Sequence, residues 1–199
     1  MIKKLFLIVL LVGPGLTGFA QIKLGPVIDL GIGFYSKTSD SLTLKGGINP
    51  AFGAMAQLDI NYMLSIRGAA TYSFKTLQTT RVNGGSTDKM NGQFLDLSVA
   101  GRFSNFDEDV KILPYGTAGL GTVFTIVSKG QEKYMKGCTY NTAIPYFTVG
   151  AGTGIKMSYF SEFDLSLNYT RFLSPMFLTP IDGKDARLNQ VSLKIAALF

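Results

Sequence analysis

Residues 189–199 read Asn-Gln-Val-Ser-Leu-Lys-Ile-Ala-Ala-Leu-Phe. In an extended chain, Val191, Leu193, Ile195, Ala197 and Phe199 fall on one side, because side chains of a β-strand alternate with a period of two. The other side carries Gln190, Ser192, Lys194 and Ala196. The pattern therefore predicts a strand with one apolar face and one largely polar face.

Seven further segments show the same alternation. Tyr, Phe, Thr, Val and Ile dominate them, as they do in strands, and nothing after residue 20 shows the 3.6-residue stripe of an amphipathic helix. Eight alternating segments of about ten residues suit a barrel that crosses a membrane. We therefore predict an all-β fold, an eight-stranded antiparallel up-and-down transmembrane β-barrel. The seven segments are 25–35, 51–62, 64–75, 94–103, 112–127, 144–157 and 163–172.

The connections between these segments alternate in length. Four are long and polar, and three are short: one near 61–63, the acidic turn 104–109 and one near 159–162. Long loops on one side and short turns on the other are typical of outer-membrane barrels. This arrangement predicts that both termini lie at the periplasmic end and that four loops lie outside the cell. The long connections are 36–50, 76–93, 128–143 and 174–187.

The first 20 residues have the layout of a secretory signal peptide. Lys3 and Lys4 precede the apolar run 5–12, and small residues lead to Ala20. An apolar run of this length is too short to span a bilayer, which takes about 20 residues. We expect a signal peptide at 1–20, with cleavage after Ala20, and a barrel domain at 21–199.

The composition argues against several classes of function. The chain has no histidine, which removes the usual general base and the commonest metal ligand. Its net charge of +6 falls to +4 without Lys3 and Lys4, a mild excess that does not suggest nucleic acid. The single cysteine, Cys138, excludes a disulfide within the chain and is expected to be an incidental loop residue. We expect no catalytic residue, no metal, no cofactor and no enzymatic activity.

The polar face of the predicted strands carries a nearly balanced set of charges. An eight-stranded barrel is only wide enough for side chains to fill it, so these charges should pair with one another inside the lumen. Their expected role is structural, as a packed plug. The predicted lumenal charge network comprises Asp29, Asp59, Arg67, Asp96, Arg102, Lys156, Asp164 and Lys194, with Lys75 on the same face.

Two stretches resemble a known family. They are Pro114-Tyr-Gly-Thr-Ala-Gly-Leu-Gly-Thr-Val-Phe124 and Leu165-Ser-Leu-Asn-Tyr-Thr-Arg-Phe-Leu-Ser-Pro175. They are similar to the fifth and seventh strands of PorT-like outer-membrane barrels, although Asn168 stands where that family often has arginine. Residues 21–199 as a whole resemble the small eight-stranded barrels of the OmpX and OmpA class.

The resemblance implies a location and a set of partners. Val191, Leu193, Ile195 and Phe199 match the C-terminal assembly signal of outer-membrane barrels. The implied location is the outer membrane of a diderm bacterium. The implied partners are outer-membrane lipid, lipopolysaccharide and the barrel assembly machinery during insertion, together with secretion-system or extracellular proteins.

Four functional hypotheses fit these patterns. The first is a non-enzymatic barrel with a structural or interaction role through its four loops. The second, from the PorT resemblance, is an accessory component of a protein secretion system. The third is a channel for small solutes, and the fourth is a soluble lipocalin-like binder of small ligands with its apolar face inward.

Overall fold

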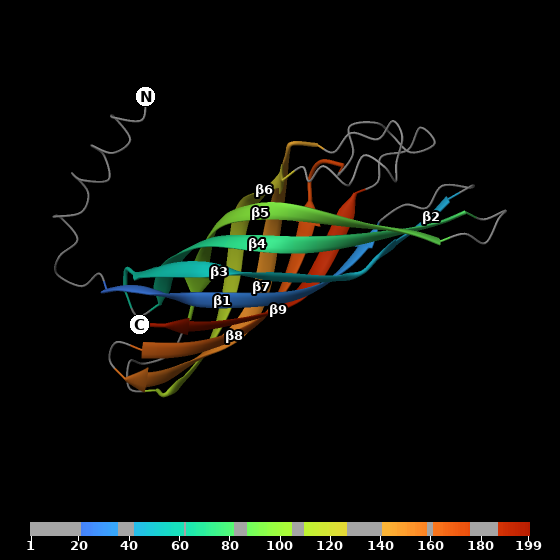
Figure 1. Cartoon of the computed structure of the whole chain (residues 1–199). Helices are drawn as coiled ribbons and strands as arrows, with labels where there is room; N and C mark the ends of the chain where they lie inside the picture. Colours follow the sequence, from blue (N-terminus) through green and yellow to red (C-terminus); the bar gives the residue numbers. More distant parts are fainter. Residues whose placement is uncertain are drawn as a thin grey trace, which may run out of the picture.

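Nine strands form one sheet in this computed structural model, which describes residues 21–35, 42–61, 63–81, 87–104, 110–126, 141–158, 161–175 and 187–199 (Figure 1). The described part of the chain contains no helix long and apolar enough to cross a membrane. The expected signal peptide and Cys138 lie outside the described residues. The strands are β1 Gln21–Tyr35, β2 Leu42–Gly46, β3 Ile48–Asp59, β4 Leu64–Arg81, β5 Thr87–Phe103, β6 Ile112–Ile126, β7 Ala143–Ser158, β8 Ser161–Phe172 and β9 Leu188–Leu198.

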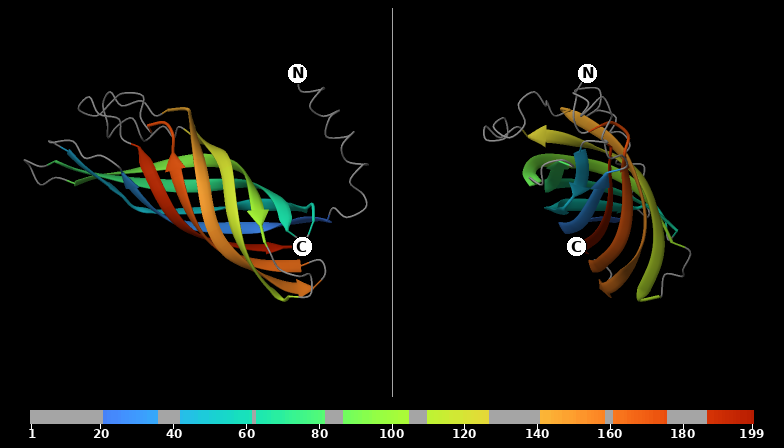
Figure 2. Two further views of the ribbon diagram at one scale, coloured as in Figure 1. Left: turned by 180° about the vertical axis from the view of Figure 1, so that it is seen from behind. Right: turned by 90° about the vertical axis from the view of Figure 1, so that its right-hand side faces the viewer.

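The sheet closes on itself. Around the barrel the order is β1, β3, β4, β5, β6, β7, β8 and β9, and β9 pairs with β1 again. Every pairing is antiparallel, and β2 adds to the far end of β4. Closure removes the free edges of a sheet, and the strands wind around one axis in all views (Figure 2). The predicted eight-stranded antiparallel barrel is confirmed.

The strands are staggered by ten residues around the barrel. A circuit of paired residues that leaves β1 at Leu24 returns to β1 at Phe34. With a strand spacing of about 4.8 Å and a rise of about 3.3 Å per residue, this stagger corresponds to a tilt of about 40°. Because the stagger is even, inward residues stay beside inward residues all the way around. The circuit passes Leu24, Ala56, Gly68, Val99, Leu120, Phe147, Arg171, Asn189 and Phe34.

The two faces of the strands point as the alternation predicts. On β6, the outward Leu120 is 66% exposed, whereas the inward Val123 is fully buried. Leu193 on β9 is exposed, and its neighbour Ser192 is buried. The apolar face is therefore the exterior of the barrel, and most polar side chains line the lumen.

The barrel has two distinct ends. The terminal end holds the start of β1 and the end of β9, with the short connections 60–63, 104–111 and 159–160. In the first of these, the Asn61 side chain accepts hydrogen bonds from the backbone amides of Met63 and Leu64, at 2.9 and 2.7 Å. The loop end holds the ends of β1, β4, β6 and β8 and the starts of β3, β5, β7 and β9.

The predicted connections 36–50 and 76–93 are partly wrong. Residues 42–46 form β2, and β4 and β5 stay paired as far as Thr80 and Thr87. Together β2, β4 and β5 extend beyond the other strands at the loop end (Figure 1). Segments such as Thr76–Thr80 show little apolar alternation, yet backbone hydrogen bonds to a partner strand suffice to continue a ladder.

Gly53 sits where β3 approaches the backbone of β4. A Cβ atom built on Gly53 would lie 2.0 Å from the carbonyl oxygen of Ala70, whereas one on Gly68 would meet nothing closer than 4.0 Å. We expect Gly53→Ala to lower the free energy of unfolding by about 1–3 kcal/mol, since the strands must separate to admit a methyl group. Gly68→Ala is the matched control and should leave stability nearly unchanged. Urea unfolding of the protein in vesicles measures both, and equal effects would contradict the close approach.

Candidate functional site

Glu162 is the centre of a charge network at the terminal end of the lumen. Its side chain is 1% exposed and lies within 4 Å of three cations. The distances to the nearest carboxylate oxygen are 2.7 Å from Arg102 Nη1, 3.5 Å from Lys23 Nζ and 3.8 Å from Arg67 Nη2. Arg102 Nη1 and Glu162 Oε1 are close but are not aligned as a hydrogen bond, so their attraction is mainly electrostatic.

Asp164 forms the second anionic position, two residues further along β8. Arg67 Nη2 donates to Asp164 Oδ2 at 2.6 Å, and the Tyr115 hydroxyl donates to the same carboxylate at 2.7 Å. The guanidinium groups of Arg67 and Arg102 lie 4.6 and 4.3 Å from the centroid of the Tyr115 ring. The ring therefore contacts both cations, which favours keeping two arginines close together.

Asp59 completes the network beside β1. Lys23 Nζ lies 2.9 Å from Asp59 Oδ2, and Ser65 and Gln57 donate to Oδ1 at 2.7 and 2.6 Å. Gln57 in turn accepts from Arg67 Nε at 2.8 Å. Three cations thus meet three carboxylates, and we infer that this layer of side chains blocks the terminal end of the lumen.

A layer of apolar side chains fills the lumen at the loop end. Lys75 lies among these groups, with its ammonium 6.0 and 5.3 Å from the centroids of the Phe94 and Phe172 rings. Its ammonium also donates to Gln190 Oε1 at 3.3 Å. We infer that this layer is a second barrier across the lumen. Its apolar members, all at most 1% exposed, are Phe94, Val123, Ile144, Phe172 and Leu188.

Pairing is looser between the two layers. Lys194 Nζ lies 3.9 Å from Asp29 Oδ2, and Asp29 Oδ1 has no hydrogen-bond partner among the described residues. Asp96 accepts a hydrogen bond from the Tyr146 hydroxyl. The middle of the lumen therefore holds charges without the dense contacts of the terminal end.

The structure places all eight residues of the predicted charge network on the lumenal side. Asp59, Arg67, Arg102 and Asp164 come together at the terminal end. Lys156 lies opposite Glu162 in the β7–β8 ladder, while Asp29, Asp96 and Lys194 lie nearer the middle. In the predicted assembly signal, Val191, Leu193, Ile195 and Phe199 all point outward.

Several members of the network lie outside the predicted set. Glu162 was assigned to a connection, although it shares the parity of Asp164 and belongs to β8. Lys23 was missed because β1 begins at Gln21, before the predicted start of that strand. Tyr115 and Gln57 are uncharged, and only their hydrogen bonds reveal their part in the network.

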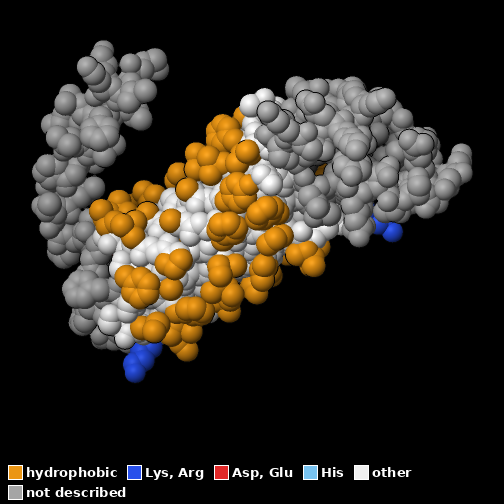
Figure 3. Space-filling view, viewed as in Figure 1, with side chains coloured by type: hydrophobic (Ala, Val, Ile, Leu, Met, Phe, Trp, Pro, Cys, Tyr) orange, Lys and Arg blue, Asp and Glu red, His pale blue; other side chains and the backbone are white. Residues whose placement is uncertain are grey.

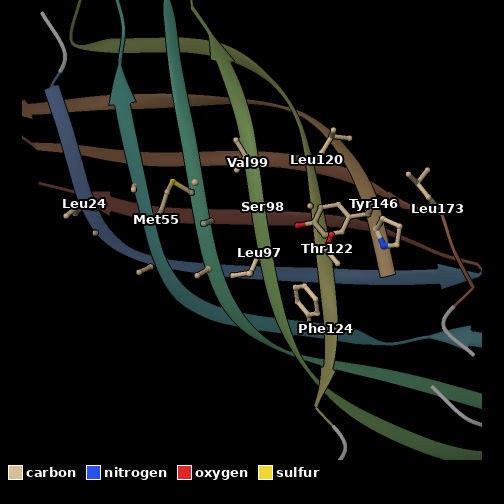
Figure 4. A pocket seen from close by; sticks show the side chains of 18 residues that line it. Leu24, Met55, Leu97, Ser98, Val99, Leu120, Thr122, Phe124, Tyr146 and Leu173 are labelled. Carbon is tan, nitrogen blue, oxygen red and sulfur yellow. The ribbon is translucent and has the colours of Figure 1, made fainter. Parts of the chain in front are cut away.

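The exterior carries a belt of apolar side chains around the barrel (Figure 3). A hollow of about 1180 Å³ lies against this wall, and its lining is mostly apolar. The lining includes the outward-facing Leu97 and Val99 and the inward-facing Tyr146 (Figure 4). The cross-strand pairs Ala54–Ala70 and Ala56–Gly68 make the wall thin there. Its lining offers little polar chemistry, and no group of three or more metal-ligating residues occurs within the described ranges.

Comparison with solved structures identifies the fold. The chain matches the outer membrane protein OprG from Pseudomonas aeruginosa with a TM-score of 0.60 and 9% identity, over 90% of this chain and 93% of OprG. It matches the Neisserial surface protein A, NspA, with a TM-score of 0.55 and 16% identity, over 91% and 99% of the two chains. At these identities the likeness shows the fold alone, that of the small outer-membrane β-barrels. No protein-family model and no curated protein matches the chain.

Glu162 should contribute more to the free energy of unfolding than Asp29, a carboxylate that also faces the lumen but has only one long ion pair. We expect Glu162→Gln to lower the free energy of unfolding by about 3–5 kcal/mol, because three buried cations would then share two carboxylates. Asp29→Asn is the isosteric control and should cost clearly less, since its one ion pair is long. Denaturant unfolding in vesicles gives both values; a smaller loss for Glu162→Gln than for Asp29→Asn would refute the assigned centre of the network.

Proposed function

We propose that this protein is a non-enzymatic integral barrel of the outer membrane, with both termini periplasmic, that acts in a structural or interaction role at its loop end. The observation that carries the proposal is the inverted distribution of side chains, with apolar groups outside and charges inside. An apolar exterior of this extent would be unstable in water, whereas hydrocarbon tails solvate it.

The depth of the belt supports the same proposal. Exposed apolar side chains occur on every strand of the barrel, from Ile22 near the terminal end to Phe34 near the loop end. The closed ladder leaves the strands of the barrel without a free edge, as a membrane requires. The outward apolar face also argues against the lipocalin-like hypothesis, which needs that face inside.

The two layers across the lumen argue against a channel. Apart from Asp59, whose side chain is 23% exposed, the charged groups of the terminal-end network and the apolar side chains of the loop-end layer are nearly fully buried. An ion crossing the barrel would have to displace paired charges and then pass an apolar constriction. We therefore assign no transport role.

The loop end offers a structural basis for interaction with proteins. Beyond the barrel wall, β2 pairs with β4 alone among the described strands, and β5 has no described partner on its other side before Gln93. Such edges present unpaired backbone groups, to which an extended segment of another protein can add as a further strand. Extracellular proteins are thus the proposed partners.

A secretion accessory of the PorT type is the alternative function. It is supported by the likeness of residues 114–124 on β6 and 165–175 on and after β8 to PorT-like strands. In that case the loop end or the rim would contact components of the secretion machinery. Contact with the barrel assembly machinery and with lipopolysaccharide is proposed in either case.

If the barrel spans a membrane, the loss of stability caused by an outward-facing arginine should depend on its depth in the bilayer. Leu167 lies at the middle of β8 and Ile22 near the terminal end, and both are exposed, at 58% and 68%. Leu167→Arg should lower the free energy of unfolding in lipid vesicles by about 2–4 kcal/mol, and Ile22→Arg by about 0–1 kcal/mol. A water-soluble barrel would tolerate both equally, so equal small effects would reject membrane insertion.

If the loop end binds other proteins, shortening the β4–β5 hairpin should remove these contacts. Replacing residues 79–88 by a two-residue Asn-Gly turn shortens the β4–β5 hairpin and leaves the barrel wall intact. Proximity labelling from the loop end should then lose its extracellular neighbours, while deletion of the gene leaves export of cargo proteins unchanged. Loss of export would favour the secretion alternative.

The purified full chain should show no steady conductance in a planar bilayer, and a stable conductance would contradict the closed lumen.

A further inference from the structure

The hollow against the wall opens to the outside of the barrel. Most of its lining residues point outward, among them Leu97, Val99 and Leu120. Each inward residue of the lining is a direct neighbour in sequence of an outward one, as Ser98 is of Leu97 and Val99. Inward side chains point away from the exterior, so these residues border the hollow through their backbone atoms. The hollow is therefore a depression in the apolar belt.

Two rows of outward residues border the depression, and both run across the strands. The first follows the pairings from Leu24 on β1 to Leu120 on β6. The second lies one outward position closer to the loop end and finishes beside Leu173, whose amide donates to the Pro145 carbonyl at 2.9 Å. Figure 4 shows the crossing from Leu24 to Leu173. The second row is Ala54, Ala70, Leu97, Thr122 and Pro145.

The depression is long and narrow, which makes it a groove. Successive outward residues of one strand are about 6.6 Å apart, which sets the gap between the rows, and the strand spacings from β1 to β7 add up to about 24 Å. With a strand tilt of about 40°, the groove rises by about 15 Å, half the thickness of a hydrocarbon core.

The floor of the groove is low on β3 and β4. The Cβ atom that Gly68 lacks would meet no atom closer than 4.0 Å, so the space above this floor is open. No outward side chain here extends beyond a methyl group, whereas leucines on β1, β5 and β6 stand on either side. The outward residues of the floor are Ala54, Ala56, Gly68 and Ala70.

The lining of the groove suits hydrocarbon. None of its residues is charged, and the Thr122 hydroxyl is the polar group among its outward side chains. A headgroup, a sugar or a peptide backbone would therefore lose hydrogen bonds there. An α-helix is about 10–12 Å wide with its side chains and would bridge the two rows without entering the gap. An unbranched hydrocarbon chain fits this width and gives the small residues of the floor the contacts that they otherwise lack.

We propose that the groove binds one acyl chain of a phospholipid along an oblique path from Leu24 to Leu173. The inference rests on the proposed function, which places the terminal end, and Leu24 with it, on the periplasmic side, where phospholipid forms the leaflet. Small residues let the chain approach the backbone of β3 and β4 closely, which favours dispersion contacts. This lipid is thus held at one place, in contrast to the mobile lipid around the rest of the belt.

The test fills the groove by substitution. The full chain is reconstituted in nanodiscs of phosphatidylethanolamine and phosphatidylglycerol, and native mass spectrometry counts the lipids that stay on the barrel after its release. The wild type should retain one phospholipid. Ala70→Leu should lower the retained fraction roughly tenfold, because its side chain displaces methylene groups of the bound chain. Ala54→Leu, at the cross-strand partner of Ala70, should have the same effect and guards against a folding defect in one variant.

Ala151→Leu is the matched control, since Ala151 is an exposed outward alanine on β7 that does not line the groove. It should retain lipid as the wild type does, and equal retention by all four proteins would overturn the inference. A dimer that Ala70→Leu abolishes would make a second copy the occupant and reject the acyl chain. Stronger retention of lipopolysaccharide than of phospholipid in mixed nanodiscs would reject the assigned lipid. A barrel that inserts into vesicles yet fails these tests disproves only this inference, whereas failure to insert disproves the proposed function itself.

Discussion

An even stagger between the strands is the constraint on which the rest of this structure depends. Each strand alternates between two faces, and closing the sheet must bring like faces together at every seam. A stagger of ten residues satisfies this condition, so one surface stays apolar and the other polar around the whole circuit. An odd stagger would place the apolar face of one strand beside the polar face of its neighbour. The exterior belt and the lumenal network are therefore two consequences of one geometric fact.

The lumen shows how a narrow barrel accommodates charge without becoming a pore. Around Glu162, Arg102 and Asp164, charge balance and hydrogen bonds from neutral side chains offset much of the cost of burial. At the other end, Phe94 and Phe172 fill the lumen around Lys75. Glycine and small residues on the walls leave the room that these long side chains need. The Gly154 position illustrates this, since a Cβ there would lie 2.1 Å from Glu162 Oε1.

The proposed function relies on the surfaces of the barrel and not on its lumen. Among the described residues the lumen holds no group of three or more metal-ligating side chains, and paired charges and apolar side chains lie at its two ends. The exterior then divides into an apolar belt, basic positions such as Arg171 at its boundary, and a sheet of β2, β4 and β5 beyond it. Under the proposed function, lipid contacts the apolar belt and protein contacts the sheet at the loop end.

The sequence by itself determined the strands of the wall, their direction and the face on which each side chain lies, because alternation is a local property of an extended chain. It also placed Asp59, Arg67, Arg102 and Asp164 on a common surface. Only the tertiary structure decided which of these charges meet, since Arg67 and Asp164 are 97 residues apart and are joined by the stagger of the closed sheet. The place of Glu162 at the centre and the extension of the β4–β5 hairpin both depend on strand ends and cross-strand register. Those are set by pairing with distant segments, which no local pattern records.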